Sequence, residues 1–276
     1  MKTKNILLFT LALICSTSII RAQSAEKSQK IKKTIQASYN AKRTAEMPRD
    51  SVFKDDHLER YDVYDDNEKI IEYGQYDGEG NIYEVTKIQK DESGNPLKGT
   101  IYDSKGNVKK YYTTTIDDNG NVTEFKNYNT ENELVYLQKN EYDINGNVTS
   151  RIGSNPKSDK VFKTELEYNS KNEMIKKIKY NSDGTVKDTR TYKYDSNGNE
   201  IESELFKSNG DYTKFISTYD ERNNILTQYW YDKDGTQKHW NNWEYNYDKQ
   251  GNWITKKRYS NGELGFVWER KIEYYK

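Results

Sequence analysis

The sequence predicts an all-β fold: an extended antiparallel β-meander of about eight 26-residue double repeats, forming a single-layer or coiled sheet. One turn-like cluster recurs along the chain, and its spacing alternates between 12 and 14 residues. The segments between clusters are rich in Val, Ile, Thr and Tyr, as in VTEFKNY (122–128), and have the length of ordinary strands. A Gly-Asn pair at such short intervals would break a helix each time, so helix is excluded for the repeats. The clearest copies of the cluster are YDGEGNI (76–82), YDSKGNV (102–108), YDINGNV (142–148), YDSNGNE (194–200) and YDKQGNW (247–253).

Each cluster has the composition of a hairpin turn. Its Asp can accept hydrogen bonds from backbone amides ahead of it, and its Gly and Asn tolerate positive φ. A window such as DSNG followed by Asn suits a type I turn with a glycine bulge. One copy of the aromatic is missing between Tyr142 and Tyr168, where GSNPKSD (153–159) supplies other turn residues.

Alternation along the strands argues against an ordinary core. In VTEFKNY, Val122, Glu124, Lys126 and Tyr128 share one face, and mid-strand positions on both faces are often charged or Thr. A sandwich would need apolar residues in the middle of one face. The pattern therefore favours an extended sheet in which aromatic residues at strand ends stack and Lys/Glu pairs cross between strands.

These motifs resemble the YD repeats of the RHS family of bacterial proteins over roughly residues 59–276. The likeness lies in the Tyr-Asp and Gly-Asn positions, whereas RHS chains usually carry Arg where this chain has Asn after the turn Gly. RHS chains are far longer and close into a shell, a closure that we do not expect of so short a chain. The C-terminal stretch YDKQGNWITKKRYSNGELGFVWERKIEYY (247–275) also resembles the ending of many small exported bacterial repeat proteins, and this second resemblance implies a secreted β-repeat protein and no activity.

Residues 1–22 have the features of a secretory signal peptide. Lys2 and Lys4 precede an apolar run from Ile6 to Ile20, which is too short to span a bilayer. Cys15, the only cysteine, lies within it, and Ile14 before it disfavours lipid attachment there. We therefore expect export to the periplasm, the cell surface or the medium, and a mature chain without thiol or disulfide.

Residues 23–58 do not repeat and form a leader or linker ahead of the repeat domain, residues 59–276. Ile31, Ile35 and Tyr39 recur at helical spacing, which predicts one short amphipathic helix. A solvated linker is the alternative. In either form the leader could cover the first edge strand of the sheet.

Composition narrows the possible partners. Of the chain, 33% is hydrophobic and 32% charged, and the mean hydropathy is −1.17, but the 25 Tyr, 5 Trp and strict periodicity oppose disorder. Without residues 1–22, 41 basic residues face 44 acidic ones, a net charge of −3. Because Lys and Glu are interspersed rather than gathered in a basic stripe, nucleic acid is not an expected partner. No segment after residue 22 is apolar enough to span a membrane as a helix.

The candidate ligand-binding residues lie late in the chain, where all five tryptophans occur. Clustered aromatic side chains on an irregular loop, here DKDGTQKHWNNWEYNYD (232–248), favour recognition of a glycan or a protein. The alternative is a C-terminal cap in which large side chains seal the last strands. The candidates are Trp230, His239, Trp240, Trp243, Trp253 and Trp268.

The sequence indicates no catalytic, metal or cofactor site. It has two histidines, His57 and His239, no His pair at metal spacing and no nucleophile motif. Asp-rich turns such as DSNGN (195–199) place Gly fourth and lack the late Glu of a calcium loop. Carboxylates are abundant, but no pair is singled out for glycoside hydrolysis.

We therefore predict an exported, non-catalytic binding or scaffold protein that contacts a glycan or a protein. The alternatives are a polysaccharide-acting hydrolase and a purely structural component of the envelope. The sequence does not determine the oligomeric state.

Overall fold

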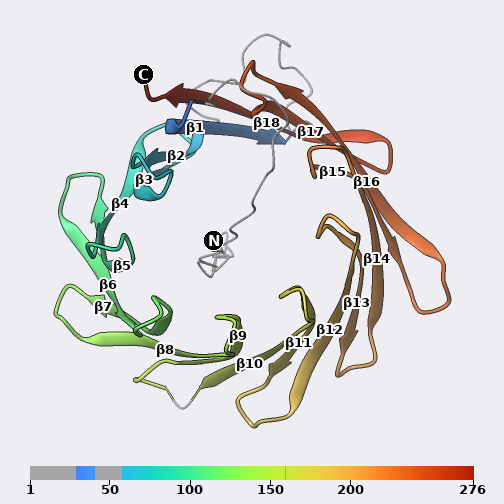
Figure 1. The fold of residues 1–276 in the computed structure, drawn as a ribbon, viewed down its shortest axis with the longest axis horizontal. Helices are drawn as coiled ribbons and strands as arrows, with labels where there is room; N and C mark the ends of the chain where they lie inside the picture. Colours follow the sequence, from blue (N-terminus) through green and yellow to red (C-terminus); the bar gives the residue numbers. More distant parts are fainter. Residues whose placement is uncertain (1–28, 41–57, 159) are drawn as a thin grey trace, which may run out of the picture.

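The computed structural model describes residues 29–40, 58–158 and 160–276, and within them it shows one sheet of 18 antiparallel strands. Figure 1 shows the strands arranged in a ring. The predicted antiparallel strands and turns are confirmed, and the gap at 153–159 also holds a turn, in which the Ser158 amide donates to the Asn155 carbonyl. None of the described residues forms a helix that could cross a membrane. The strands are β1 (Ile31–Asn40), β2 (Leu58–Tyr64), β3 (Ile70–Tyr76), β4 (Ile82–Lys90), β5 (Pro96–Asp103), β6 (Val108–Ile116), β7 (Val122–Asn129), β8 (Leu134–Tyr142), β9 (Val148–Ser154), β10 (Val161–Tyr168), β11 (Met174–Tyr180), β12 (Val186–Tyr194), β13 (Glu200–Lys207), β14 (Tyr212–Tyr219), β15 (Ile225–Tyr231), β16 (Gln237–Tyr247), β17 (Trp253–Ser260) and β18 (Glu263–Tyr274).

The sheet is a closed barrel, so the predicted open or coiled meander is wrong. Strands β2 to β18 pair in chain order, and β1 pairs with β18 on one side and β2 on the other. A long sheet of twisted strands leaves two edges with unpaired backbone groups, and joining them through one more strand satisfies both. The closing strand, β1, comes from the non-repeating segment that precedes the repeats.

The predicted helix around Ile31, Ile35 and Tyr39 is also wrong, because these residues belong to β1. Ile35 faces Lys271 of β18 and Tyr61 of β2, so the segment borders β2 as a strand. The middle of β1 is tightly enclosed, with Thr34 5% and Ala37 0% exposed. Backbone pairing on both sides outweighs the weak helical periodicity of a ten-residue segment.

The turns have the predicted hydrogen bonds. At the turn of 195–199, the Asp195 amide donates to the Asn199 carbonyl at 3.0 Å, and Asp195 Oδ1 accepts from the amides of Asn197 and Asn199 at 2.9 Å. Gly198 has φ +83°, which an L side chain rarely adopts. Asn132, Asn172 and Asn223 take the same place in other turns, with φ of 61–63°.

A one-residue register shift accompanies the turns, as at Lys193/Tyr194. It places Tyr194 opposite Glu200, so the aromatic before the turn and the first residue after it share a face. Tyr219 opposite Ile225 and Tyr247 opposite Trp253 repeat the arrangement.

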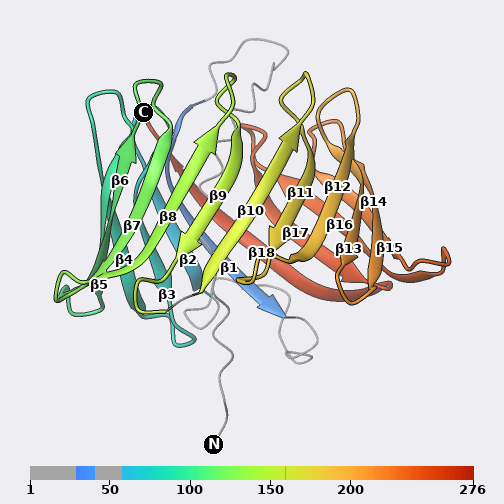
Figure 2. The same ribbon diagram turned by 90° about the horizontal axis from the view of Figure 1, so that it is seen from below.

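The two ends of the barrel differ. Turns that follow even-numbered strands form a rim whose neighbouring turns bond to one another, as in Lys90 Nζ–Asp65 Oδ2 (2.8 Å) and Asn147 Nδ2–Asn172 Oδ1 (2.8 Å). Between turns of the opposite rim, within the described residues, we find the single ion pair Lys157–Glu133. Figure 2 shows the barrel narrower at the bonded end, and we call the two ends the narrow rim and the wide rim.

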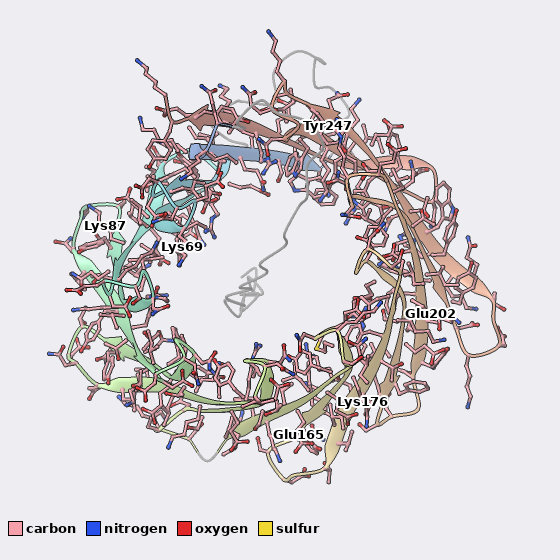
Figure 3. The ribbon with its side chains drawn as sticks, viewed as in Figure 1. Lys69, Lys87, Glu165, Lys176, Glu202 and Tyr247 are labelled. Atoms are coloured by element: carbon pink, nitrogen blue, oxygen red, sulfur yellow. The ribbon has the colours of Figure 1, made fainter. Side chains whose placement is uncertain are left out.

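The two faces of the wall carry different charges. Figure 3 shows Lys87, Glu165, Lys176 and Glu202 on the outer side of the ring. Paired residues of neighbouring strands share a face and successive residues alternate, so the register assigns the remaining strand residues to the outer or the inner face. This outer face carries Lys/Glu pairs that cross between strands. The opposite, inner face carries most of the buried side chains, including Tyr73, Thr86, Ile101, Tyr112, Leu166, Tyr192 and Ser203.

Replacing Gly198 by Ala should destabilise the fold by about 1–2 kcal/mol, because a Cβ at positive φ is strained. Gly198→Asn should cost much less, since Asn occupies this place in three other turns. Urea unfolding of both variants measures their free energies of unfolding. Equal losses of this free energy in Gly198→Ala and Gly198→Asn would contradict the prediction.

The fold should lose stability in acid. The Asn side chain four residues on, followed by backbone amides, donates to each turn carboxylate and lowers its pKa at Asp91, Asp103, Asp117, Asp143 and Asp195. A carboxyl pKa that is lower in the folded state stabilises above the unfolded value of about 4, and this contribution is lost as the pH falls through the folded pKa.

Urea midpoints measured between about pH 6 and pH 3 should therefore fall on acidification. A variant with all five aspartates replaced by Asn, the residue that already opens the turns at Asn129, Asn169 and Asn181, should show a flatter profile. An equally steep profile in that variant would assign the acid sensitivity to other groups.

Candidate functional site

The six candidate residues lie on strands rather than on a loop. His239, Trp240 and Trp243 belong to β16, which begins directly after the turn of 232–236, so the predicted long loop is wrong. Trp230 and His239 face each other on the inner face, and Trp243 follows on the same face of β16. Trp268 is also inward, whereas Trp240, opposite Tyr229, is on the outer face.

The sixth residue, Trp253, also lies on the inner side, because the turn bulge pairs it with the inward Tyr247. The guanidinium of inward Arg270 lies 3.6 Å from the centre of its ring, and Arg270 Nε and Nη2 donate to the Trp253 carbonyl at 3.0 and 2.8 Å. The structure therefore brings five of the six candidates onto the inner face of β15–β18.

One part of this surface is an aromatic group on β14–β16. The rings of Phe215 and Trp230 meet edge to face at 5.7 Å, and Trp230 lies 4.5 Å from His239. Trp230 Nε1 donates to Gln228 Oε1 at 3.0 Å, which fixes the indole along its own strand.

A buried polar pair supports these rings. Asn241 is only 4% exposed, and its Oδ1 accepts from Ser260 Oγ at 2.8 Å and lies 3.1 Å from His239 Nε2. The amide thus ties β16 to β17 and holds the imidazole in place.

The centre of the surface is a row of two cations on β17. Lys256 and Arg258 both point inward, and the register places an aromatic residue beside each of them on both neighbouring strands. Lys256 Nζ is 4.9 Å from the centre of the Trp268 ring, and Arg258 Cζ is 4.6 Å from that of Phe266. Phe266 and Trp268 stack at 5.6 Å with an interplanar angle of 19°. We call Lys256, Arg258, Arg270, Trp243, Trp253, Phe266 and Trp268 the inner patch.

The positive charges of the inner patch are partly buried and repel one another. Burial, and then the nearby charges of Arg258 and Arg270, lower the pKa of Lys256. Burial also lowers the pKa of Arg270. Within the described part of the chain, neither Lys256 nor Arg258 has a carboxylate within salt-bridge distance, and the buried Arg258 Nε has no hydrogen-bond partner.

Sequence reasoning missed the arginines. All five arginines of the described strands lie on the inner face: Arg60, Arg151, Arg190, Arg258 and Arg270. The sequence does contain a signal for this placement. Side chains alternate between the two faces of a strand, so the arginines lie on the face opposite the Lys/Glu pairs. Assigning that face to the inside of the protein requires knowing that the sheet closes into a barrel.

Metal binding finds no support in the described ranges. Among residues 29–40, 58–158 and 160–276, no three His, Cys, Asp or Glu side chains come together as a metal site would require.

Comparison with known proteins adds structural neighbours only. No family model and no curated protein matches the chain, so membership of the YD-repeat family stays a prediction. A porin-like protein from Bacteroides uniformis aligns with a TM-score of 0.47 at 8% identity, covering 88% of this chain and 96% of that one. A porin-like protein from Bacteroides vulgatus gives 0.35 at 12% identity, with coverages of 89% and 99%.

Tc toxin chains also align. The Tc holotoxin pore of Photorhabdus luminescens gives a TM-score of 0.34 at 13% identity, over 72% of this chain and 13% of that one. These scores are too low to support an argument about function, which therefore rests on the residues of this chain.

Lys256→Met should raise the melting temperature by roughly 1–3 °C, because it removes a desolvated charge that repels Arg258 and Arg270 while an unbranched side chain remains against Trp268. Lys257→Met on the outer face, opposite Glu244, is the matched control and should not stabilise. A lower melting temperature for Lys256→Met than for Lys257→Met would show that Lys256 serves stability.

Proposed function

We propose that this chain is an exported, non-catalytic binding protein that holds a glycan against the inner wall of its barrel. The observation that supports this most is the sorting of side chains: five strand arginines and four of the five tryptophans face inward. The outer face carries paired Lys and Glu instead.

The inner patch has the chemistry of a sugar site. Flat aromatic faces with a few charged and amide groups on a fixed frame are typical of ligand sites, because the rings supply contact area and the polar groups set orientation. The rings stand on paired strands, which hold them more rigidly than loops would. A protein partner would contact the same groups, and it is an outcome of the test below.

The charged side chains of the outer face indicate a barrel that is surrounded by water rather than by lipid. Charged pairs such as Lys87–Glu72 (3.8 Å) and Lys214–Glu202 (2.7 Å) lie within the strands rather than at the turns. A cation on a lipid-facing barrel wall costs about 2–4 kcal/mol at the bilayer midplane, and this wall has many. We therefore propose that the protein is exported without being inserted in a membrane. The predicted export signal, residues 1–22, lies outside the described residues.

A glycan array should identify bound sugars, and Trp268→Ala should weaken binding roughly tenfold, or ~1.4 kcal/mol, by removing an inner ring. Trp240→Ala is the matched control, because Trp240 is on the outer face against Tyr229. Isothermal titration with the best array ligand measures both.

Three outcomes would count against the proposal. Equal loss in Trp240→Ala would remove the inner wall as the site, and capture of proteins but no glycan would favour a protein partner. Hydrolysis of a bound glycan would show an enzyme.

The chain from residue 23 onward should stay monodisperse in buffer without detergent, since its outer wall is charged. Size-exclusion chromatography and flotation with neutral lipid vesicles check this. Stable incorporation into vesicles would contradict a water-facing wall.

A further inference from the structure

Within the part of the chain that the structure describes, two cations of the inner patch, Lys256 and Arg258, combine the lack of a carboxylate partner with a lining of aromatic rings. Lys177 of β11 also faces inward, and burial and neighbouring cations lower its pKa, but no cation–π contact of Lys177 is found among the described residues. Elsewhere on the inner face, Arg60 pairs with Asp62 at 2.5 Å and Arg190 with Glu200 at 3.4 Å. On the outer face, Lys193 pairs with Glu202 at 2.7 Å. On β17, by contrast, Lys256 and Arg258 have aromatic neighbours in place of carboxylates, within the described residues.

Leaving two such cations together is costly. A buried charge is normally paired, and like charges two positions apart on one strand repel. Cation–π contacts with Trp268 and Phe266 offset part of the cost, but each is worth only about 0.5–2 kcal/mol. Binding sites often contain charged groups that are unfavourable without the ligand, and here such groups are lined by aromatic rings.

Arg270 is held ready beside the two cations. Its Nε and Nη2 both donate to the Trp253 carbonyl, and its Cζ lies 3.6 Å from the centre of the Trp253 ring. These contacts restrain the guanidinium in the structure without ligand, and such a restraint lowers the entropy cost of binding.

We propose that the ligand is an acidic glycan whose carboxylate or sulfate groups bind Lys256 and Arg258 while its sugar rings stack on Trp253, Phe266 and Trp268. This rests on the proposed function and specifies its ligand class. Side chains two apart on a strand are separated by roughly 6.7 Å, so the two cations can hold separate anionic groups of one chain. The guanidinium of Arg258 suits the two oxygens of a carboxylate or sulfate.

The test titrates the protein with four probes at low ionic strength: hexagalacturonate, dextran sulfate, neutral cellohexaose and poly-glutamate. We expect one of the acidic glycans to bind, and the better of the two identifies carboxylate or sulfate as the recognised group. Its affinity should fall roughly tenfold or more in the double variant Lys256→Met/Arg258→Met. The slope of log affinity against log salt should also become shallower, because fewer ions are displaced.

Lys257→Met is the matched control, since it removes one cation from the same strand on the outer face. It should bind the acidic glycan as the unmodified protein does. The double variant is expected to fold, because it removes repulsion, and its circular dichroism and melting temperature check this. Arg258→Lys, which keeps the charge, gives a second variant that should retain most of the affinity.

The failures of the two proposals are distinguishable. If cellohexaose binds as tightly as the acidic probes and the double variant changes nothing, the acidic ligand is wrong while glycan binding stands. If none of the three glycans binds, the proposed function and this inference both fail, and tighter binding of poly-glutamate assigns the patch to an acidic peptide.

Discussion

The structure depends on the hydrogen bonds that each turn Asp makes to the amides ahead of it. At Asp195 these bonds come from Asn197 and Asn199, and the Asn199 side chain adds another at 2.9 Å. They hold a tight reversal with Gly198 at positive φ and one extra residue in the following strand. That extra residue changes which side of the sheet the next strand's side chains face, and so each turn sets the face of everything that follows it.

The turns at the two rims of the barrel differ, and this difference accounts for the alternation of the repeat spacing between 12 and 14 residues. Before the turns of the narrow rim the aromatic points inward, as at Tyr194 and Tyr219, whose hydroxyls donate to the carbonyls of Met174 and Glu200 at 2.7 and 2.9 Å. Before the turns of the wide rim it points outward, as Tyr128 does against Tyr111 at 4.8 Å. Neighbouring turns of the narrow rim are bonded to one another, whereas the described turns of the wide rim share only the ion pair Lys157–Glu133, and the sheet narrows toward the bonded end. Curvature of one sign around the whole ring brings the two edges together for β1 to join.

The sequence contains the local structure almost completely and the closure hardly at all. Asp, Asn and Gly at fixed offsets predict the hydrogen bonds of most turns, since these bonds lie within five residues. The turn at 207–211, which opens with Lys207, and the turn at 261–262, which is shorter, depart from the pattern. Closure depends on small angles summed over 18 strands and on a segment, Ile31–Asn40, without a repeat signature. The site follows the same division: aromatic residues late in the chain were visible, but the inside of a barrel cannot be assigned before the barrel is known. The arginines were overlooked for that reason, although alternation already separated them from the outward lysines.

The division of cations between the two faces has a physical basis. On the outer face a lysine such as Lys98 extends over a tyrosine ring, here Tyr111 at 4.8 Å, while its ammonium remains in water. On the crowded inner face a cation loses hydration, and a guanidinium tolerates this better because its charge is spread and its plane stacks on a ring. Arg258 lies over the Phe266 ring at 4.6 Å and Arg270 over the Trp253 ring at 3.6 Å, each measured from Cζ to the ring centre. Lys256 and Lys177 depart from this division, because each is a compact inward charge whose pKa is lowered by burial and by neighbouring cations. The aromatic rings beside Lys256 and Arg258 distinguish these two cations from Lys177. An anionic group of a bound ligand would complete the surroundings of the two cations.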